Sequence, residues 1–217
     1  MEVKSDRTKP MFLAVCTITV WLAIIIQFIL IITNRAAPVP ETIIRFFSYY
    51  TILTNILVAC CFTALLLKSR SAKAGFFTSS EVLTATTVYI TIVGVVYNLI
   101  LRHLWDPQGL QLIVDELLHT VIPLLFILYW FISVPKAGLQ WKSIFTWLIY
   151  PLTYFIFILF RGTLSGFYPY PFIDVNDLGY NKALLNSVYI TIAFILLSLF
   201  IVAFAKIISR KALKIKS

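Results

Sequence analysis

Long apolar runs separated by short, more polar stretches form the main pattern of this chain. Six of the runs have about the 20 residues that an α-helix needs to cross a bilayer. We therefore expect an all-α fold, a polytopic membrane protein whose six transmembrane helices form one bundle. The predicted spans, within a single integral membrane domain over residues 1–217, are 11–33, 42–67, 82–101, 112–134, 143–160 and 183–208.

Composition supports a membrane protein and excludes an ordinary soluble domain. Hydrophobic residues make up 60% of the 217 residues and charged residues only 12%, whereas charged residues are roughly 25% of a typical soluble domain. A soluble fold of this length could not hide so much apolar surface, but lipid tails accept it. The cysteines Cys16, Cys60 and Cys61 lie inside apolar runs, without the spacing of a metal or disulfide framework.

The lysines and arginines predict how the chain is oriented. Cytoplasmic loops are enriched in these residues, and the side that carries both chain ends holds most of them. We therefore expect cytoplasmic N- and C-termini in the cell membrane, and we ascribe the net charge of +9 to topology rather than to nucleic-acid binding. The residues on the predicted cytoplasmic side are Lys4, Arg7, Lys9, Lys68, Arg70, Lys73, Lys136, Lys142, Lys206, Arg210, Lys211, Lys214 and Lys216.

The predicted outer loop over residues 161–182 is rich in proline, glycine and tyrosine. Proline and glycine exclude one continuous helix there. The loop is either an interfacial aromatic belt or a cap that folds back over a site between the helices.

Polar groups inside the fourth predicted span suggest a functional site. His119 lies about 10 Å below the outer start of that span, from the rise of a helix. Asp115 is one turn earlier on the same face, where it can orient the imidazole and stabilise its protonated form. The alternative is a histidine that bonds a neighbouring helix for packing.

The second span contributes hydroxyl and amide groups at a similar depth. Thr51 lies about 12–14 Å from the outer start of the span, and Thr54 and Asn55 follow within one turn. Either threonine can simply bond the carbonyl four residues earlier, as is common in membrane helices.

Together these residues fit an acyl-transfer site. A threonine hydroxyl needs a base, so Thr51 is the expected nucleophile, with Thr54 as its competitor, and His119 is the expected base. Donors for the oxyanion remain open among Asn55, Asn98, Arg161 and Tyr170, and Arg161 can equally be a membrane anchor. A site at this depth meets membrane lipid first, so a lipid-like ester is the expected substrate, with no metal or cofactor.

Three segments resemble one protein family. YYTILTNILV, DELLHTVIPLLF and SGFYPYPFI, with a weaker match in VGVVYNLILRHLWDP, are similar to segments of the androgen-induced-gene proteins, the androgen-dependent TFPI-regulating protein and their bacterial relatives. The resemblance covers residues 46–172. It departs from the animal proteins in the spacing of HTVIP, which is one residue shorter, and in Asp115, which replaces an asparagine.

The resemblance implies a chemistry. The eukaryotic members are transmembrane threonine hydrolases that cleave fatty acid esters of hydroxy fatty acids, which implies Thr51 as nucleophile and His119 as base. Two other functions remain open: a proton- or anion-coupled transporter that uses His119, Asp115 and Arg161, and a non-enzymatic lipid-binding protein. The sequence leaves the oligomeric state open.

Overall fold

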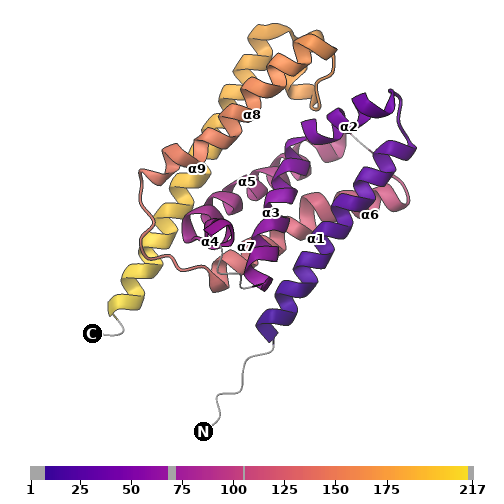
Figure 1. Ribbon diagram of the computed structural model, residues 1–217. Helices are drawn as coiled ribbons and strands as arrows, with labels where there is room; N and C mark the ends of the chain where they lie inside the picture. The colour runs from indigo at the N-terminus through magenta and orange to yellow at the C-terminus, as the bar shows by residue number, and fades with distance from the viewer. Residues whose placement is uncertain (1–7, 68–71, 105, 215–217) are drawn as a thin grey trace.

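The computed structural model describes residues 8–67, 72–104 and 106–214, which are helical apart from short connections (Figure 1). One of the short elements, η2, is a π-helix. The elements in chain order are α1 (Thr8–Thr33), α2 (Val39–Ser48), α3 (Tyr50–Leu67), α4 (Ala72–Thr78), α5 (Ser80–Leu99), η1 (Leu101–His103), α6 (Leu110–Glu116), η2 (Leu117–Val121), α7 (Ile122–Ser133), α8 (Ser143–Ser165), η3 (Pro171–Ile173) and α9 (Val175–Lys214).

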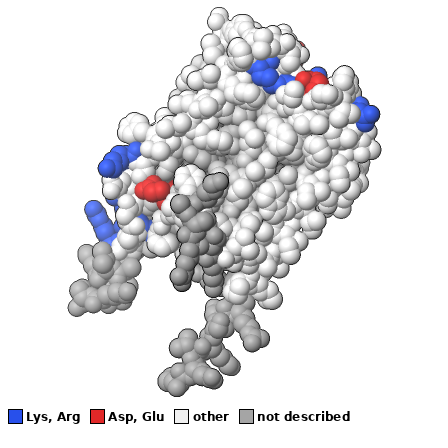
Figure 2. Space-filling view, viewed as in Figure 1, with Lys and Arg blue, Asp and Glu red and all other residues white. Residues whose placement is uncertain are grey.

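The predicted all-α bundle of six membrane-spanning helices is confirmed. Six helical stretches are long and apolar enough to cross a membrane. On the face drawn in Figure 2, charged side chains gather near the two ends and leave an uncharged surface between them. The stretches are Pro10–Thr33, Tyr50–Leu67, Ser80–His103, Leu110–Ser133, Ser143–Ser165 and Val175–Arg210.

The two ends of the bundle are distinct. Helix α1 begins and α9 ends at the same end (Figure 1), which we call the terminal end. The opposite end carries α2 and the loop over residues 166–174. The cytoplasmic location of the terminal end stays a prediction, and Lys4, Arg7, Lys68, Arg70 and Lys216, on which it partly depends, lie outside the described residues.

The helices pack as two groups. Helix α3 packs along α1 and α5, and α5 also contacts α7. Phe62 of α3 and Phe126 of α7 meet edge to face at 5.1 Å between ring centroids. Helices α8 and α9 pair as a long hairpin, and α9 packs against α5. The hairpin loop thereby reaches the start of α3.

The second predicted span is two helices rather than one. Helices α2 and α3 meet at Tyr49, whose backbone is extended (φ −80°, ψ 124°) and interrupts the helical hydrogen bonds. Helix α8 supports the break, because the Tyr154 hydroxyl donates to the carbonyl of Ser48 at 2.9 Å. The first turn of α3 therefore begins inside the bundle.

The fourth predicted span contains a π-turn. Pro123 has no N–H to donate to the His119 carbonyl, and the Ile122 N–H bonds Leu117 instead of Leu118. Helix α5 approaches this turn closely at Gly94, where a Cβ would lie 3.2 Å from the His119 carbonyl oxygen. Wide turns of this kind often occur at functional sites.

The last two spans also extend beyond their predicted bounds. Helix α8 continues to Ser165 and α9 begins at Val175, with a break at Gly179 (φ 72°). The connecting loop is thus shorter than predicted, and it turns at Gly166 in a left-handed conformation (φ 68°), which glycine adopts readily.

Candidate functional site

Thr51 occupies the first turn of α3, directly after the break at Tyr49. Threonines in regular membrane helices commonly bond the carbonyl four residues earlier. In the part of the chain that the structure describes, the Thr51 hydroxyl makes no such bond, because the helix does not continue backwards. It lies instead 3.4 Å from the Tyr170 hydroxyl, so it is available for chemistry inside the bundle.

Tyr170 reaches this position from the loop between α8 and α9. Its hydroxyl accepts the N–H of Thr51 at 3.2 Å, one of the donors that a helix N-terminus leaves unsatisfied. Its ring stacks on Phe172 at 5.2 Å and meets Tyr49 edge to face. Burial raises the pKa of Tyr170 to about 12, so the phenol keeps its proton at neutral pH and can donate it.

His119 is held in one tautomer by the main chain. Its Nδ1 lies 2.9 Å from the carbonyl oxygen of Asp115. A carbonyl only accepts, so in the neutral ring Nδ1 carries the proton and Nε2 presents a lone pair. The ring stacks on Tyr97, 4.0 Å between centroids and 13° apart. His119 therefore has the form that a general base requires.

Asp115 contacts both His119 and Gln111. Its main-chain carbonyl orients His119, while its carboxylate accepts a hydrogen bond from Gln111 at 3.1 Å. Gln111 also donates to Gln27 of α1 at 2.9 Å. The side chain thus belongs to a polar wall that joins α6 to α1.

Asn55 and Asn98 hold the π-turn rather than face a cavity. The Asn55 amide donates to the carbonyls of Thr51 (2.9 Å) and Leu118 (3.2 Å). The Asn98 amide donates to the carbonyl of Gly94 at 2.8 Å and lies 3.4 Å from that of His119. The Leu118 and His119 carbonyls are those that lose their usual donors in the turn, so both asparagines position the site.

Thr54 and Arg161 lie away from this arrangement. The Thr54 hydroxyl is fully buried against that of Tyr150 at 3.2 Å. Arg161 donates to Glu41 at 2.7 Å and to the Phe167 carbonyl at 3.2 Å, which ties α8 to α2 and to the loop. Neither side chain lines the cavities beside Thr51.

The sequence analysis missed Glu41, which together with Arg45 and Arg161 forms a latch between α2 and α8. It bonds Arg45 at 2.8 Å as well as Arg161, and the hydrogen bond from Arg45 is the main reason that its pKa is lowered. The spacing of Glu41 and Arg45, four residues apart, is a signal that the sequence contains. Contact with Arg161 has no such signal.

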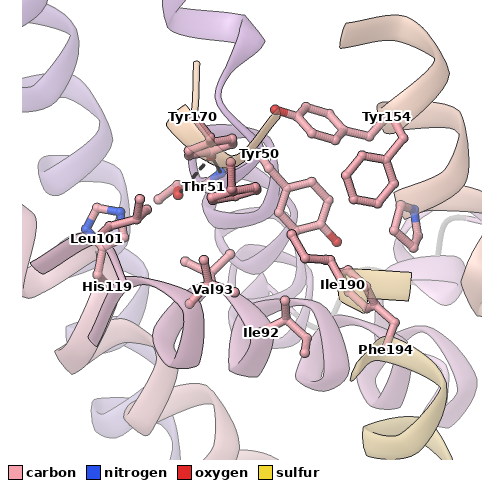
Figure 3. Close-up of a pocket in the computed structure, with 14 residues that line it drawn as sticks. Tyr50, Thr51, Ile92, Val93, Leu101, His119, Tyr154, Tyr170, Ile190 and Phe194 are labelled. Carbon is pink, nitrogen blue, oxygen red and sulfur yellow. Dashed lines mark hydrogen bonds between the residues drawn. The ribbon is translucent and has the colours of Figure 1, made fainter. Parts of the chain in front are cut away.

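Thr51 and His119 line the same two cavities, one of which is drawn in Figure 3. A small apolar cavity of about 40 Å³ lies toward α8 and α9. A larger one of about 460 Å³ extends toward α1 and includes Gln27, Gln111 and Asp115. Thr51 and His119 are not hydrogen-bonded to each other within the described chain, so a proton would pass between them through water or after a side-chain rotation.

Metal-ligating side chains do not cluster in the described ranges. No three histidine, cysteine, aspartate or glutamate side chains there lie close enough together to hold a metal ion. Cys16, Cys60 and Cys61 are free thiols.

Comparison of the chain with protein-family models, with curated proteins and with solved structures found no match. The resemblance to the androgen-induced-gene proteins therefore stays a prediction from the segments quoted above. What can be argued about function rests on the geometry of the site.

Proposed function

We propose that this protein is an intramembrane hydrolase of lipid esters in which Thr51 is the nucleophile and His119 the base. One observation carries the proposal: the Thr51 hydroxyl and the His119 ring come from different spans and line the same two cavities. The substrate type that the family resemblance suggests is a fatty acid ester of a hydroxy fatty acid.

In the first step, His119 Nε2 accepts the Thr51 proton through one water, and Thr51 Oγ bonds the ester carbonyl carbon. The negative charge that forms on the carbonyl oxygen needs preorganised donors. Tyr170 can provide one, because its oxygen accepts the Thr51 N–H and its hydroxyl proton can turn from Thr51 Oγ, 3.4 Å away, to the carbonyl oxygen. The imidazolium then returns the proton to the leaving alkoxide, and the alcohol departs.

In the second step, water hydrolyses the acyl-threonine. His119 removes a proton from the water, the hydroxide attacks the acyl carbon, and the proton returns to Thr51 Oγ as the fatty acid leaves. The larger cavity, with its glutamine and aspartate side chains, offers a path for that water. The smaller, apolar cavity suits the part of the acyl chain next to the carbonyl.

The test is ester hydrolysis by the purified full-length protein in lipid nanodiscs. The substrate is a long-chain acyloxy fatty acid, and the released fatty acid is measured by mass spectrometry. Thr51→Ala and His119→Ala are each expected to lower kcat by at least about a thousandfold, because removing a nucleophile or its base costs up to about a millionfold in a well-studied hydrolase. Thr51→Ser keeps the hydroxyl and should retain measurable activity.

Thr54→Ala is the matched control, because Thr54 lies one turn away but lines neither cavity. It should stay within about threefold of wild type, the range expected of a residue without a catalytic role. Full activity in Thr51→Ala, or a loss confined to Thr54→Ala, would overturn the assignment. Substrate binding without turnover in the wild-type protein would favour the non-enzymatic lipid-binding function.

A further inference from the structure

A third cavity beside α3, larger than the two at Thr51 and His119, lies outside the candidate hydrolase site. It has a volume of about 670 Å³ and is formed by α3, α4, α5 and α8. It shares no lining residue with the two cavities at Thr51 and His119. Its size is that of sites which bind small organic ligands.

The walls of this cavity are mostly apolar and suit a hydrocarbon chain. From Glu81, in the first turn of α5, to Tyr89 on the same helix, the cavity extends about 12 Å along the helix axis. An acyl chain is the apolar ligand that a bilayer supplies at this depth. The apolar walls include Leu53, Leu57, Phe76, Phe77, Val82 and Trp147.

A single charged group lies at the end of the cavity near the terminal end of the bundle. The Glu81 carboxylate accepts a hydrogen bond from the Ser143 hydroxyl at 2.9 Å, which fixes its orientation. Within the described residues it forms no ion pair, whereas Glu41 and Glu116 are both paired with arginine. A carboxylate at the edge of a membrane cavity is stabilised by a cation.

We propose that this cavity binds a phospholipid with an ammonium headgroup, with the ammonium against Glu81 and one acyl chain between α3, α5 and α8. Charge complementarity selects the headgroup, because Glu81 is the one charged residue among the described residues that line the cavity. An ammonium next to Glu81 completes an ion pair that an anionic headgroup cannot form. The site is independent of the proposed hydrolase.

The test compares two lipids with identical acyl chains, phosphatidylethanolamine and phosphatidylglycerol. Delipidated full-length protein is titrated with each lipid, and bound lipid is counted by native mass spectrometry. Wild type should bind phosphatidylethanolamine at least about fivefold more tightly than phosphatidylglycerol, a modest difference in keeping with one interfacial ion pair. Glu81→Gln should abolish that preference, and equal binding of both lipids by wild type overturns the headgroup assignment.

A second pair of variants tests the cavity itself. Ala85→Phe fills it from α5 and should remove the tightly bound lipid, while Ile156→Phe adds the same ring on a surface that is 71% exposed and should change nothing. A photoreactive phosphatidylethanolamine should label α3 and α5 in Ile156→Phe but not in Ala85→Phe. If Ala85→Phe misfolds, labelling of the wild-type protein still decides whether the lipid occupies this cavity. Labels found only outside the cavity overturn the proposal.

Discussion

The two halves of the bundle use their polar side chains differently. In the half near the terminal end, helices are regular and the threonine hydroxyls bond their own helix, as Thr87 bonds the Leu83 carbonyl at 2.8 Å, while Ser143 and Tyr89 join α8 to α5. In the half near the opposite end, the backbone is broken at Tyr49 and widened at His119. There, polar side chains bond carbonyls and N–H groups of other helices.

This difference shows why the candidate site is where it is. In a regular helix the backbone N–H and C=O groups are already paired with each other. A threonine or serine hydroxyl there bonds a carbonyl of its own helix. An irregular turn leaves carbonyls and N–H groups without partners inside the membrane, where each is costly. Asn55, Asn98, Tyr154 and Tyr170 meet that need, and in doing so they bring Thr51 and His119 to common cavities.

The largest effect on the difference between the two halves is expected from displacing the loop between α8 and α9. A Cβ on Gly162 would lie 2.1 Å from the ring of buried Tyr168, so Gly162→Ala must push the loop and Tyr170 away from Thr51. Misplacement of a catalytic group by about 1 Å can cost about a hundredfold, and we expect that loss in kcat/KM for ester hydrolysis.

Gly75→Ala is the matched change in the other half, because no atom lies within 4 Å of its Cβ position. It should leave hydrolysis within about twofold of wild type, and alanine is the better helix former. Equal rates for the two variants would mean that the loop does not position Tyr170.

A smaller effect is expected on stability, where Asn55→Ala and Thr87→Ala should differ. Asn55→Ala leaves the Leu118 carbonyl without its donor, so we expect it to lower the free energy of unfolding by about 1–2 kcal/mol, as for interhelical hydrogen bonds in membranes. Thr87→Ala removes only a bond within its own helix and should cost less than about 0.5 kcal/mol. Detergent-induced unfolding followed by circular dichroism measures both, and equal losses would contradict the distinction between the halves.

The smallest effect concerns the latch at Glu41. The pKa of Glu41 is lowered in the folded protein, chiefly by the hydrogen bond from Arg45. The latch therefore stabilises the folded protein fully at pH values above the pKa of a glutamate in the unfolded chain, about 4.3. That stability is lost as the pH falls through the lower, folded pKa. The thermal midpoint should therefore drop as the pH falls below about 4.3, and the drop should be smaller in Glu41→Gln. An identical pH profile for the two proteins would exclude the latch as its cause.

The sequence by itself determined the architecture and the candidate chemistry. Bilayer thickness sets the length of a spanning helix, so six apolar runs were enough to predict six spans. Polar side chains are expensive inside such runs, so Thr51, Asn55 and His119 could be singled out without coordinates. The amphipathic start of the second span and the proline after His119 were visible in the sequence. The break at Tyr49 and the π-turn at His119, which accompany them, were not.

Tertiary structure alone decided which of these groups meet. Thr51 and Thr54 are three residues apart in one apolar run. The break at Tyr49 and the contact with Tyr170 place Thr51 at the cavities. Thr54 instead lies against Tyr150. Asn55 contacts a carbonyl 63 residues away, and Arg161 contacts Glu41 across 120 residues. Such contacts depend on how whole helices pack, and spacing along one helix carries no information about them.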